Sequence, residues 1–349
     1  MGEPRPGVRL ADHTTLRVGG PAAEYVEAVT PDEVVAAVRE ADRAGMPVLV
    51  LGGGSNVLVA DEGFDGRVVH VASRGVRADA DDPDDLACLG AVTVTVAAGE
   101  DWDGVVARAV RAGWVGVEAL SGIPGSTGAT PIQNVGAYGQ EVAQTIASVR
   151  TWDRREDALR TFAAADCGFG YRTSRFKEEP GRYVVLEVSF LLRQGDLGAP
   201  VAYVELARAL GLEVGARAPL ADVRTEVLRL RAGKGMVLDT DDHDTWSAGS
   251  FFTNPVVAPD VVPDGAPVWP QPGGRVKTSA AWLIEHAGFG KGHGDERAAL
   301  SDKHTLALTN RGTASAADLV ALAREVRGGV ETAFGIRLVN EPVLVGLEL

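Results

Sequence analysis

Cysteine is scarce in this sequence, and long apolar runs are missing. Cys88 and Cys167 are the only two cysteines among 349 residues, too few for a framework of disulfides or structural zinc. No apolar run reaches the roughly 18 residues that indicate a transmembrane helix. The opening MGEPRPGVRL has neither an apolar signal core nor the hydroxyl residue of a myristoylation site. We therefore expect a cytoplasmic protein without membrane insertion.

Basic residues are also fewer than acidic ones. Lys and Arg number 34 against 48 Asp and Glu, so the formal net charge is −14. Nucleic acids and anionic membranes require a positive surface, and we expect neither as a partner. A small anion held by a few local cations is compatible with this charge. The acidic segments 79–85 and 239–244 and the six scattered histidines lack ligand spacing, so we expect no metal.

The hydrophobic pattern switches repeatedly between helix and strand. Thr30 can cap a helix that Glu33 strengthens with a capping box and Gly45 ends. Asp101 can cap another. The expected helices cover 30–45, 101–113, 201–211, 219–233, 279–286 and 315–334, and the expected strands cover 47–51, 67–72, 92–99, 182–193, 304–310 and 336–346. This mixture favours an α+β fold. The length predicts two or three domains, with a boundary near Pro219.

The segment LGGGSNVLV (51–59) follows an expected strand. Its three glycines would let the backbone approach a ligand closely, and successive N–H groups could cradle a phosphate. It matches neither the G-x-G-x-x-G nor the Walker pattern. Taken alone, it is explained at least as well by a tight turn.

The segment SGIPGSTGATPIQNVGAYGQE (121–141) is more informative because it carries no charge before its final glutamate. Together with Ile123, Ile132 and Val135, this indicates a buried loop. The polar backbone groups of a buried loop need partners. A large polar cofactor would provide them, and so would a packed Ω-like loop.

Isolated reactive groups are further candidates. Arg172 in YRTSRFK and Lys234 in RAGKGMVLD are cations that could hold an anion, and a solvated surface explains them equally well. Ser250 lies in GSFFTNPVV, where a hydroxyl could give a proton to a strongly basic acceptor. The G-x-S-x-G pattern of an acyl-transfer nucleophile is absent. Glu341 lies among apolar residues and is either functional or paired.

Seven segments in order resemble one family. They are LGGGSNVLV, SGIPGSTGATPIQNVGAYGQE, GYRTSRFK, KGMVLD, AGSFFTNP, VKTSAAWLIEHAGFGKG and NEP. From about His13 to Glu341 the chain is similar to the UDP-N-acetylenolpyruvoylglucosamine reductases, or UDP-N-acetylmuramate dehydrogenases. The resemblance implies an FAD-binding unit of the vanillyl-alcohol-oxidase (PCMH) type and a smaller α/β substrate-binding domain. The implied domains are 1–70 with 335–349, 71–218, and 219–334.

The resemblance also implies roles for individual residues. Catalysis would depend on Arg172, Ser250 and Glu341. Noncovalent FAD would contact Gly52, Gly53, Gly54, Ser55, Asn56, Ser121, Gly122, Gly125, Ser126, Gly128, Asn134, Gly136 and Tyr138. The UDP-sugar would contact Tyr203, Lys234, Asn254 and His286. Tyr203 would belong to an additional loop found in one form of the family, and His286 stands where the family often has glutamine.

The implied reaction reduces UDP-N-acetylglucosamine enolpyruvate to UDP-N-acetylmuramate, for peptidoglycan precursor synthesis. NADPH would supply a hydride that reaches the enolpyruvyl β-carbon through FAD. Arg172 and Glu341 would act on the adjacent carboxylate, and Ser250 would protonate the α-carbon. NADPH enters only through the resemblance, since the sequence has no nicotinamide fingerprint. We expect a monomer.

Two other interpretations stay open. One is a carbohydrate or alcohol oxidase of the same fold. Such enzymes often tether flavin through His or Cys, and neither glycine-rich segment contains either residue. The other is a nucleotide-sugar binding module without redox turnover, which the combination of Arg172, Ser250 and Glu341 disfavours.

Overall fold

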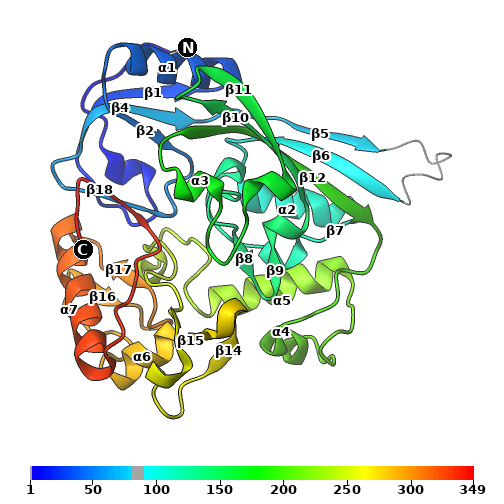
Figure 1. The fold of residues 1–349 in the computed structure, drawn as a ribbon, viewed down its shortest axis with the longest axis vertical. Coiled ribbons are helices and arrows are strands. Elements are labelled where there is room, and N and C mark those ends of the chain that lie inside the picture. The colour runs from blue at the N-terminus through cyan, green and yellow to red at the C-terminus, as the bar shows by residue number, and fades with distance from the viewer. Residues whose placement is uncertain (1, 81–89) are drawn as a thin grey trace. The chain divides into compact units, whose positions relative to one another are not determined.

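The computed structural model describes residues 2–80 and 90–349 (Figure 1). The chain divides into two compact units. The first comprises Met1–Gly7, Ala23–Gly53 and Asp65–Ala232, and the second comprises Val8–Ala22, Gly54–Phe64 and Gly233–Leu349. Of the predicted acidic loop 79–85, Asp79 ends up in a strand. The residues from Asp81 to Asp85, and Cys88, lie outside the described residues.

The first unit contains a small sheet covered by helix α1. Its strands, in order, are β1 (Ala22–Ala28), β4 (Phe64–Val71) and β2 (Val48–Leu51). Helix α1 (Pro31–Arg43) begins as predicted, because the Thr30 hydroxyl accepts the Glu33 N–H. In the predicted capping box, the Glu33 carboxylate would accept the N–H of Thr30. It accepts the N–H of Val29 instead, at 2.8 Å, one residue before the cap.

A larger antiparallel sheet forms the rest of the first unit's framework. Its strands, in order, are β11 (Ala158–Ala163), β10 (Ile146–Asp153), β12 (Tyr183–Gln194), β6 (Ala91–Ala97) and β5 (Val76–Ala80), and β7 (Trp114–Val115) also pairs with β12. Alternate side chains of β6 and β12 point into one apolar core, as a period of two residues requires. The predicted strands 92–99 and 182–193 are therefore confirmed.

Helices and short segments complete the first unit. They are α2 (Trp102–Arg111), α3 (Arg175–Glu178), α4 (Val204–Ala209), α5 (Leu220–Ala232), and the short strands β8 (Gly136–Ala137) and β9 (Gln140–Glu141). Asp101 caps α2 as predicted, accepting from Gly104 N–H. Helix α5 belongs to this unit, which ends at Ala232. The compact unit therefore extends one helix beyond the predicted boundary near Pro219, and the division into three domains stays a prediction.

The second unit is built around two helices and short strands. They are α6 (Ala280–His286), α7 (Ala316–Phe334), the parallel pair β3 (Val57–Val59) and β18 (Val343–Val345), the antiparallel pair β16 (Ala298–Leu300) and β17 (Leu308–Asn310), and the sheet β13 (Val256–Val257), β15 (Val276–Thr278) and β14 (Val268–Pro270). The buried faces of α6 and α7 share a second apolar core with Phe251 and Phe252.

Two predicted strands are much shorter in the structure. Residues 304–310 contain only β17, and residues 336–346 contain only β18. The remaining residues of the second stretch make single main-chain bonds instead of a ladder, including Thr253 N–H to Val339 C=O at 3.0 Å. Residues 304–307 instead form a turn, in which the Ala307 N–H donates to His304 C=O, so the alternating pattern overestimated regular pairing in both stretches.

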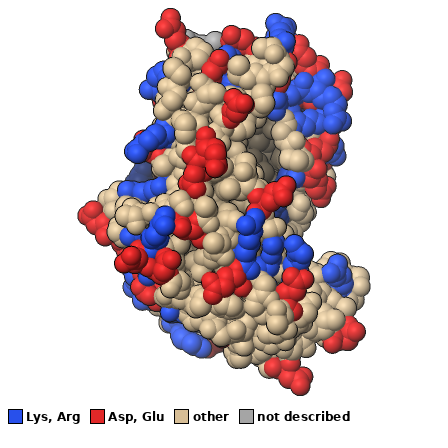
Figure 2. All heavy atoms as spheres, turned by 90° about the vertical axis from the view of Figure 1, so that its left-hand side faces the viewer, with Lys and Arg blue, Asp and Glu red and all other residues tan. Residues whose placement is uncertain are grey.

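Charged side chains of both signs are interspersed on the face that Figure 2 shows, rather than segregated into one field. Within the described ranges, no helix combines the length and apolar character needed to cross a membrane. Residues 2–80 and 90–349 also contain no group of three or more His, Cys, Asp or Glu side chains that could hold a metal ion.

Candidate active site

The glycine-rich segment 121–139 is largely buried, as its lack of charge predicted. Ser121 and Thr127 are fully buried. Its backbone is anchored to residues 98–102, since Thr127 N–H donates to Glu100 C=O and Gly128 N–H to Ala98 C=O, both at 2.8 Å. Ile132 is an exception: its side chain is exposed, so it does not hold the segment inside.

Gly52 and Gly53 lie directly against this buried segment. A Cβ atom on Gly53 would lie 2.7 Å from the Cα of Gly125, and one on Gly52 would collide with the Ser126 hydroxyl. The two predicted cofactor loops therefore touch through glycine backbone at a distance that excludes any side chain. The glycines at 52 and 53 are therefore required by the packing of the two loops against each other.

The second part of the glycine-rich segment 51–59 has a different environment. Gly54 has a φ of +62°, and a Cβ there would collide with the His13 carbonyl oxygen. The Asn56 side chain donates from Nδ2 to the main-chain carbonyl of Glu341 at 3.4 Å. The main-chain carbonyl of Asn56 accepts the Val343 N–H at 3.0 Å. The loop thus fixes the backbone that carries Glu341.

Arg172 is held by main-chain acceptors in the first unit. Its Nη2 donates to Gly136 C=O at 2.9 Å and its Nη1 to Asn134 C=O at 3.4 Å. The Lys177 ammonium donates to the Arg172 carbonyl at 3.0 Å. A guanidinium has five N–H donors in a fixed fork, so these contacts orient the group.

Three residues of this region adopt left-handed backbone conformations. Asn134, Tyr138 and Arg172 have φ values of 48°, 49° and 54°. Non-glycine residues rarely adopt such angles, which cost on the order of 1–3 kcal/mol each and concentrate at functional sites. All three were predicted site residues, so backbone strain marks the region that the motifs had indicated.

Asn134 is the hub that stabilises this strained region. Its Nδ2 donates to a Glu141 carboxylate oxygen at 2.7 Å and to Gly170 C=O at 3.1 Å. Its Oδ1 accepts the Ala143 N–H at 3.1 Å. The side chain is fully buried. Asn134 therefore acts on neighbouring backbone, and its left-handed angle is one that asparagine tolerates well.

Tyr138 and Tyr203 meet edge to face. Their ring centroids are 5.6 Å apart, with planes at 90°, a favourable arrangement for two aromatic rings. Burial raises the pKa of Tyr138 to about 12, with Glu205 and Tyr203 adding to the shift and Arg231 opposing it. The Tyr138 phenol is therefore neutral at physiological pH and can donate a hydrogen bond. The Tyr203 side chain is about half exposed.

In the second unit, three chain segments bring Ser250 and Glu341 into one junction. The Phe251 N–H donates to Leu306 C=O at 2.7 Å, and the Phe251 C=O accepts the Glu341 N–H at 2.8 Å. Phe252 forms an antiparallel bridge with Asn340. The segment carrying Ser250 thus lies between the other two, and each neighbour is fixed by main-chain bonds.

A histidine that sequence reasoning did not select shares this junction. His304 Nε2 lies 3.4 Å from Ser250 Oγ. In the sequence, no second metal ligand stands at a suitable spacing from His304, so this residue carried no signal there. The signal is the pairing of residue 251 with residue 306, which only the fold reveals.

The predicted substrate-binding residues occupy distinct local settings. Asn254 Oδ1 accepts the Ala280 N–H at the start of α6, at 2.9 Å, so a ligand contact would use its Nδ2 donors. His286 stacks on Trp282, with centroids 3.7 Å apart, and its Nδ1 lies 2.9 Å from the Trp282 carbonyl. Lys234 follows α5 and precedes Gly235, whose φ is +65°.

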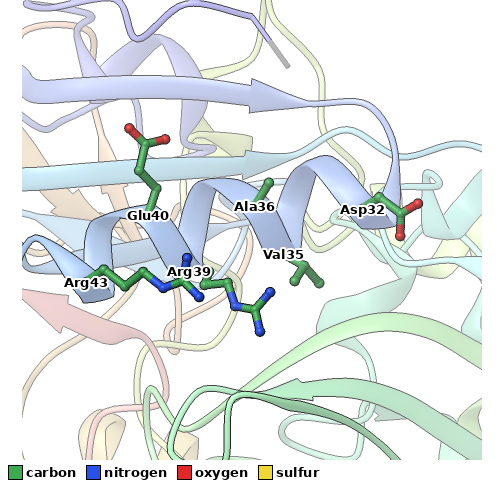
Figure 3. A pocket seen from close by; sticks show the side chains of 6 residues that line it. All are labelled: Asp32, Val35, Ala36, Arg39, Glu40 and Arg43. Atoms are coloured by element: carbon green, nitrogen blue, oxygen red, sulfur yellow. The ribbon is translucent and has the colours of Figure 1, made fainter.

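A surface pocket lies elsewhere, on helix α1 of the first unit. Figure 3 shows Val35, Arg39 and Arg43 along one side of the helix at this pocket. None of the predicted site residues lines it. Arg39 is already committed to a bidentate ion pair with Asp157, at 2.6 Å, and we assign this pocket no role.

The predicted residues thus form two groups. Asn134, Tyr138, Arg172 and Tyr203 belong to the first unit, whereas Asn56, Ser250 and Glu341 belong to the second. Convergence of Arg172 with Ser250 and Glu341 stays a prediction.

Comparison with known protein families matches both parts of the chain. Residues 22–161 match the family described as FAD binding domain. Residues 241–345 match UDP-N-acetylenolpyruvoylglucosamine reductase, C-terminal domain. The chain is therefore a flavoprotein oxidoreductase with an α+β fold, and the predicted FAD-binding unit and enzyme class are confirmed.

Individual relatives agree. A UDP-N-acetylenolpyruvoylglucosamine reductase from Cutibacterium acnes is 60% identical over 97% of this chain and 89% of its own length. One from Streptomyces coelicolor is 57% identical over 97% of this chain and 90% of its own length. The crystal structure of the reductase from Thermus caldophilus covers 98% of this chain and 100% of its own, with a TM-score of 0.67 and 28% identity. The chain belongs to the UDP-N-acetylenolpyruvoylglucosamine reductase family.

Proposed function

We propose that this enzyme reduces UDP-N-acetylglucosamine enolpyruvate to UDP-N-acetylmuramate, with NADPH as electron donor and FAD held noncovalently. This reaction serves peptidoglycan precursor synthesis, and we propose a monomer acting in the cytoplasm. The observation that carries the proposal is the main-chain junction at Phe251, which joins the segments of a hydroxyl and a carboxylate. In the proposed reaction the hydroxyl is the proton donor, and the carboxylate acts on the substrate carboxylate.

The residues present fit FAD. Gly52 and Gly53 approach Gly125 and Ser126 so closely that a Cβ would not fit, which supports a cradle for the cofactor. Tyr138 would line the flavin with its neutral phenol. When bound, FAD supplies the hydride that adds to the enolpyruvyl β-carbon, having received it from NADPH.

Arg172 acts on the substrate carboxylate in this proposal. Hydride addition at the β-carbon moves negative charge onto the α-carbon and its carboxylate. The Arg172 guanidinium is oriented by Asn134 and Gly136 before substrate arrives. Such preorganised donors stabilise developing charge without reorganisation. Glu341 would polarise the same group.

Ser250 then donates its hydroxyl proton to the α-carbon. The carbanionic α-carbon is basic enough to take a proton even from a serine. A positioned acid typically contributes about 10²–10⁴-fold to the rate. The main-chain bonds on both sides of Phe251 support this role, because they limit movement of the neighbouring hydroxyl.

Tyr203, Lys234, Asn254 and His286 would hold the UDP-sugar. The contact of His286 Nδ1 with a carbonyl favours a proton on Nδ1, since a carbonyl only accepts. The neutral ring would then offer Nε2 only as an acceptor. Donation to a diphosphate would need the imidazolium form, whereas a glutamine donates at any pH.

One assay tests the proposed function. NADPH oxidation by the purified yellow protein is followed with and without UDP-N-acetylglucosamine enolpyruvate. We expect oxidation that depends on this substrate and a product that is UDP-N-acetylmuramate. Oxidation that is independent of the sugar, or transferred only to oxygen, would contradict the proposal. Release of the flavin on denaturation checks that it is noncovalent.

A further inference from the structure

The hydroxyl of Ser250 has a protonatable neighbour. His304 Nε2 lies 3.4 Å from Ser250 Oγ. Both side chains are half-buried, so they are sheltered but within reach of solvent protons. The contact is a consequence of main-chain pairing, because the Phe251 N–H is bonded to Leu306 C=O at 2.7 Å.

A tight turn presents the imidazole. The Ser301 hydroxyl accepts the N–H groups of Lys303 and His304, at 3.0 and 3.3 Å. The His304 carbonyl accepts the Ala307 N–H at 3.0 Å. The backbone on both sides of the histidine is therefore fixed beside the segment that carries Ser250.

Protonation of carbon by a serine leaves an alkoxide, which is a strong base and is costly to hold in a partly buried site. A nearby imidazolium removes that cost by giving its own proton to the oxygen. Imidazole titrates near pH 6.5 in water, so it can be recharged from solvent under physiological conditions.

We propose that His304 is the proton relay of Ser250. This inference rests on the proposed function, in which Ser250 protonates the α-carbon. The Ser250 O–H bond breaks as the α-carbon C–H bond forms. The His304 N–H bond breaks as the Ser250 O–H bond is restored, and its electron pair remains on Nε2. The neutral imidazole then regains a proton from water, so the sequence consumes one proton and no oxidant or reductant.

The charged groups around the relay have identifiable positions. The Lys303 ammonium is paired with Asp242, and Asp302 is paired with Arg311 at 2.7 Å. The Glu285 carboxylate of α6 accepts the Thr305 hydroxyl at 3.1 Å. Glu341 enters the same junction through its backbone. The charged groups on the His304 turn or bonded to it are thus Lys303, Asp302, Asp242, Asp244, Arg311 and Glu285, and Glu341 lies on the segment bonded to Phe251.

The relay predicts a specific pH dependence. At saturating substrate, the substrate-driven reoxidation of the flavin slows as pH rises and the imidazolium fraction falls. The NADPH-driven reduction of the flavin does not involve Ser250 and keeps its own pH profile. The proposed contact of His286 with the diphosphate affects KM instead, so saturation with substrate separates the two histidines.

The test measures both half-reactions by stopped flow from pH 5.5 to about 9. The variants are His304→Gln, His304→Ala and Ser250→Ala. His293→Gln is the matched control, because His293 is bonded to Glu325 of α7 at 2.9 Å. We expect His304→Gln to slow reoxidation about 10- to 100-fold at neutral pH and to flatten its pH profile. The control and the reductive half-reaction keep wild-type rates.

A second measurement does not depend on turnover. The imidazole ¹⁵N resonances of the holoenzyme are recorded against pH, and the His304 signal is assigned by its loss in His304→Gln. We expect Ser250→Ala to shift that signal. An unshifted signal, or reoxidation by both His304 variants with wild-type rate and slope, overturns the relay. Wild-type protein without substrate-dependent turnover overturns the proposed function as well.

Discussion

Arg172 and Ser250 belong to different units, and the two units hold their proposed catalytic residues by different means. Arg172 depends on side chains and strained backbone: it has a φ of 54°, and its neighbours Asn134 and Tyr138 share the left-handed conformation. Ser250 lies in a segment fixed by ordinary main-chain bonds to Leu306 and Glu341. Substitutions near Arg172 should therefore disturb geometry, whereas substitution of Ser250 should remove chemistry and leave geometry intact.

Ser250→Ala tests the chemical side of this comparison most strongly. We expect reoxidation of the flavin by substrate to fall about 10²–10⁴-fold, because the proton donor is lost. Reduction by NADPH and the melting temperature should stay near wild type. Thr253→Val is the matched control, because Thr253 lies in the same segment as Ser250 and its hydroxyl donates to Val339 C=O. An equal loss in both half-reactions would remove Ser250 from the protonation step.

Gly53→Ala tests the cofactor cradle. The added Cβ would lie 2.7 Å from Gly125 Cα, which is backbone and cannot yield easily. We expect a loss of about 1–3 kcal/mol in the free energy of unfolding of the holoprotein, accompanied by release of flavin.

Gly328→Ala is the control for Gly53→Ala. Gly328 lies within α7, and a Cβ added there would meet nothing within 4 Å apart from its own helix backbone. Alanine there should stabilise the protein by about 0.5–1 kcal/mol. Thermal unfolding and flavin absorbance after gel filtration measure both effects. Full retention of flavin by Gly53→Ala would contradict the cradle.

Asn134 variants sharpen the geometric side of the comparison. Asn134→Gly keeps the left-handed backbone and loses the bonds to Glu141, Gly170 and Ala143. Asn134→Ala also adds strain of about 1–2 kcal/mol. We expect kcat/KM to fall in both, with the alanine variant about tenfold lower than the glycine variant. Equal kinetics in the two variants would show that the backbone angle does not position Arg172.

Substitution of Asp103, in the first unit, should produce the smallest effect, and the quantity affected is the free energy of unfolding. Burial raises the pKa of its carboxyl, but the ion pair with Arg224 and the Gly122 N–H outweigh it and hold that pKa below its usual range. The pKa of Asp103 in the folded protein lies below the pKa of aspartate in the unfolded chain, which is about 3.9. The charged carboxylate therefore stabilises the protein above about pH 3.9. This stability is lost as the pH falls through the pKa of the folded protein.

We therefore expect Asp103→Asn to lose about 1 kcal/mol at pH 7 and progressively less below pH 4. Urea unfolding at several pH values measures this difference. Glu213→Gln, at an exposed position of the same unit, is the control. A loss in Asp103→Asn that stays constant down to the lowest pH would contradict the assigned role of the charge.

Local signals in the sequence predicted local structure well. Thr30 and Asp101 cap their helices because a cap depends only on residues within one turn. The absence of charge in 121–139 predicted burial correctly, although Ile132 is exposed. The order of the seven motifs identified the family, since order survives where individual patterns are ambiguous.

Non-local features could not be predicted in the same way. The contact between His304 and Ser250 depends on the bond of Phe251 to Leu306, which no periodicity encodes. The strain at Asn134, Tyr138 and Arg172 depends on a network that includes Glu141 and Gly170. The length of β17 was overestimated because residues 304–307 form a turn, and that of β18 because residues 336–342 pair by single bonds.

The central position of Phe251 has a consequence for motion. Its amide and carbonyl are both engaged, so its amide hydrogen can exchange with deuterated solvent only when the Leu306 bond opens. Such opening would also carry Ser250 away from His304. If exchange at the Phe251 amide is slow, the segment stays closed during the catalytic cycle. The Ser250 hydroxyl oxygen would then move only by rotation about the Cα–Cβ bond of Ser250.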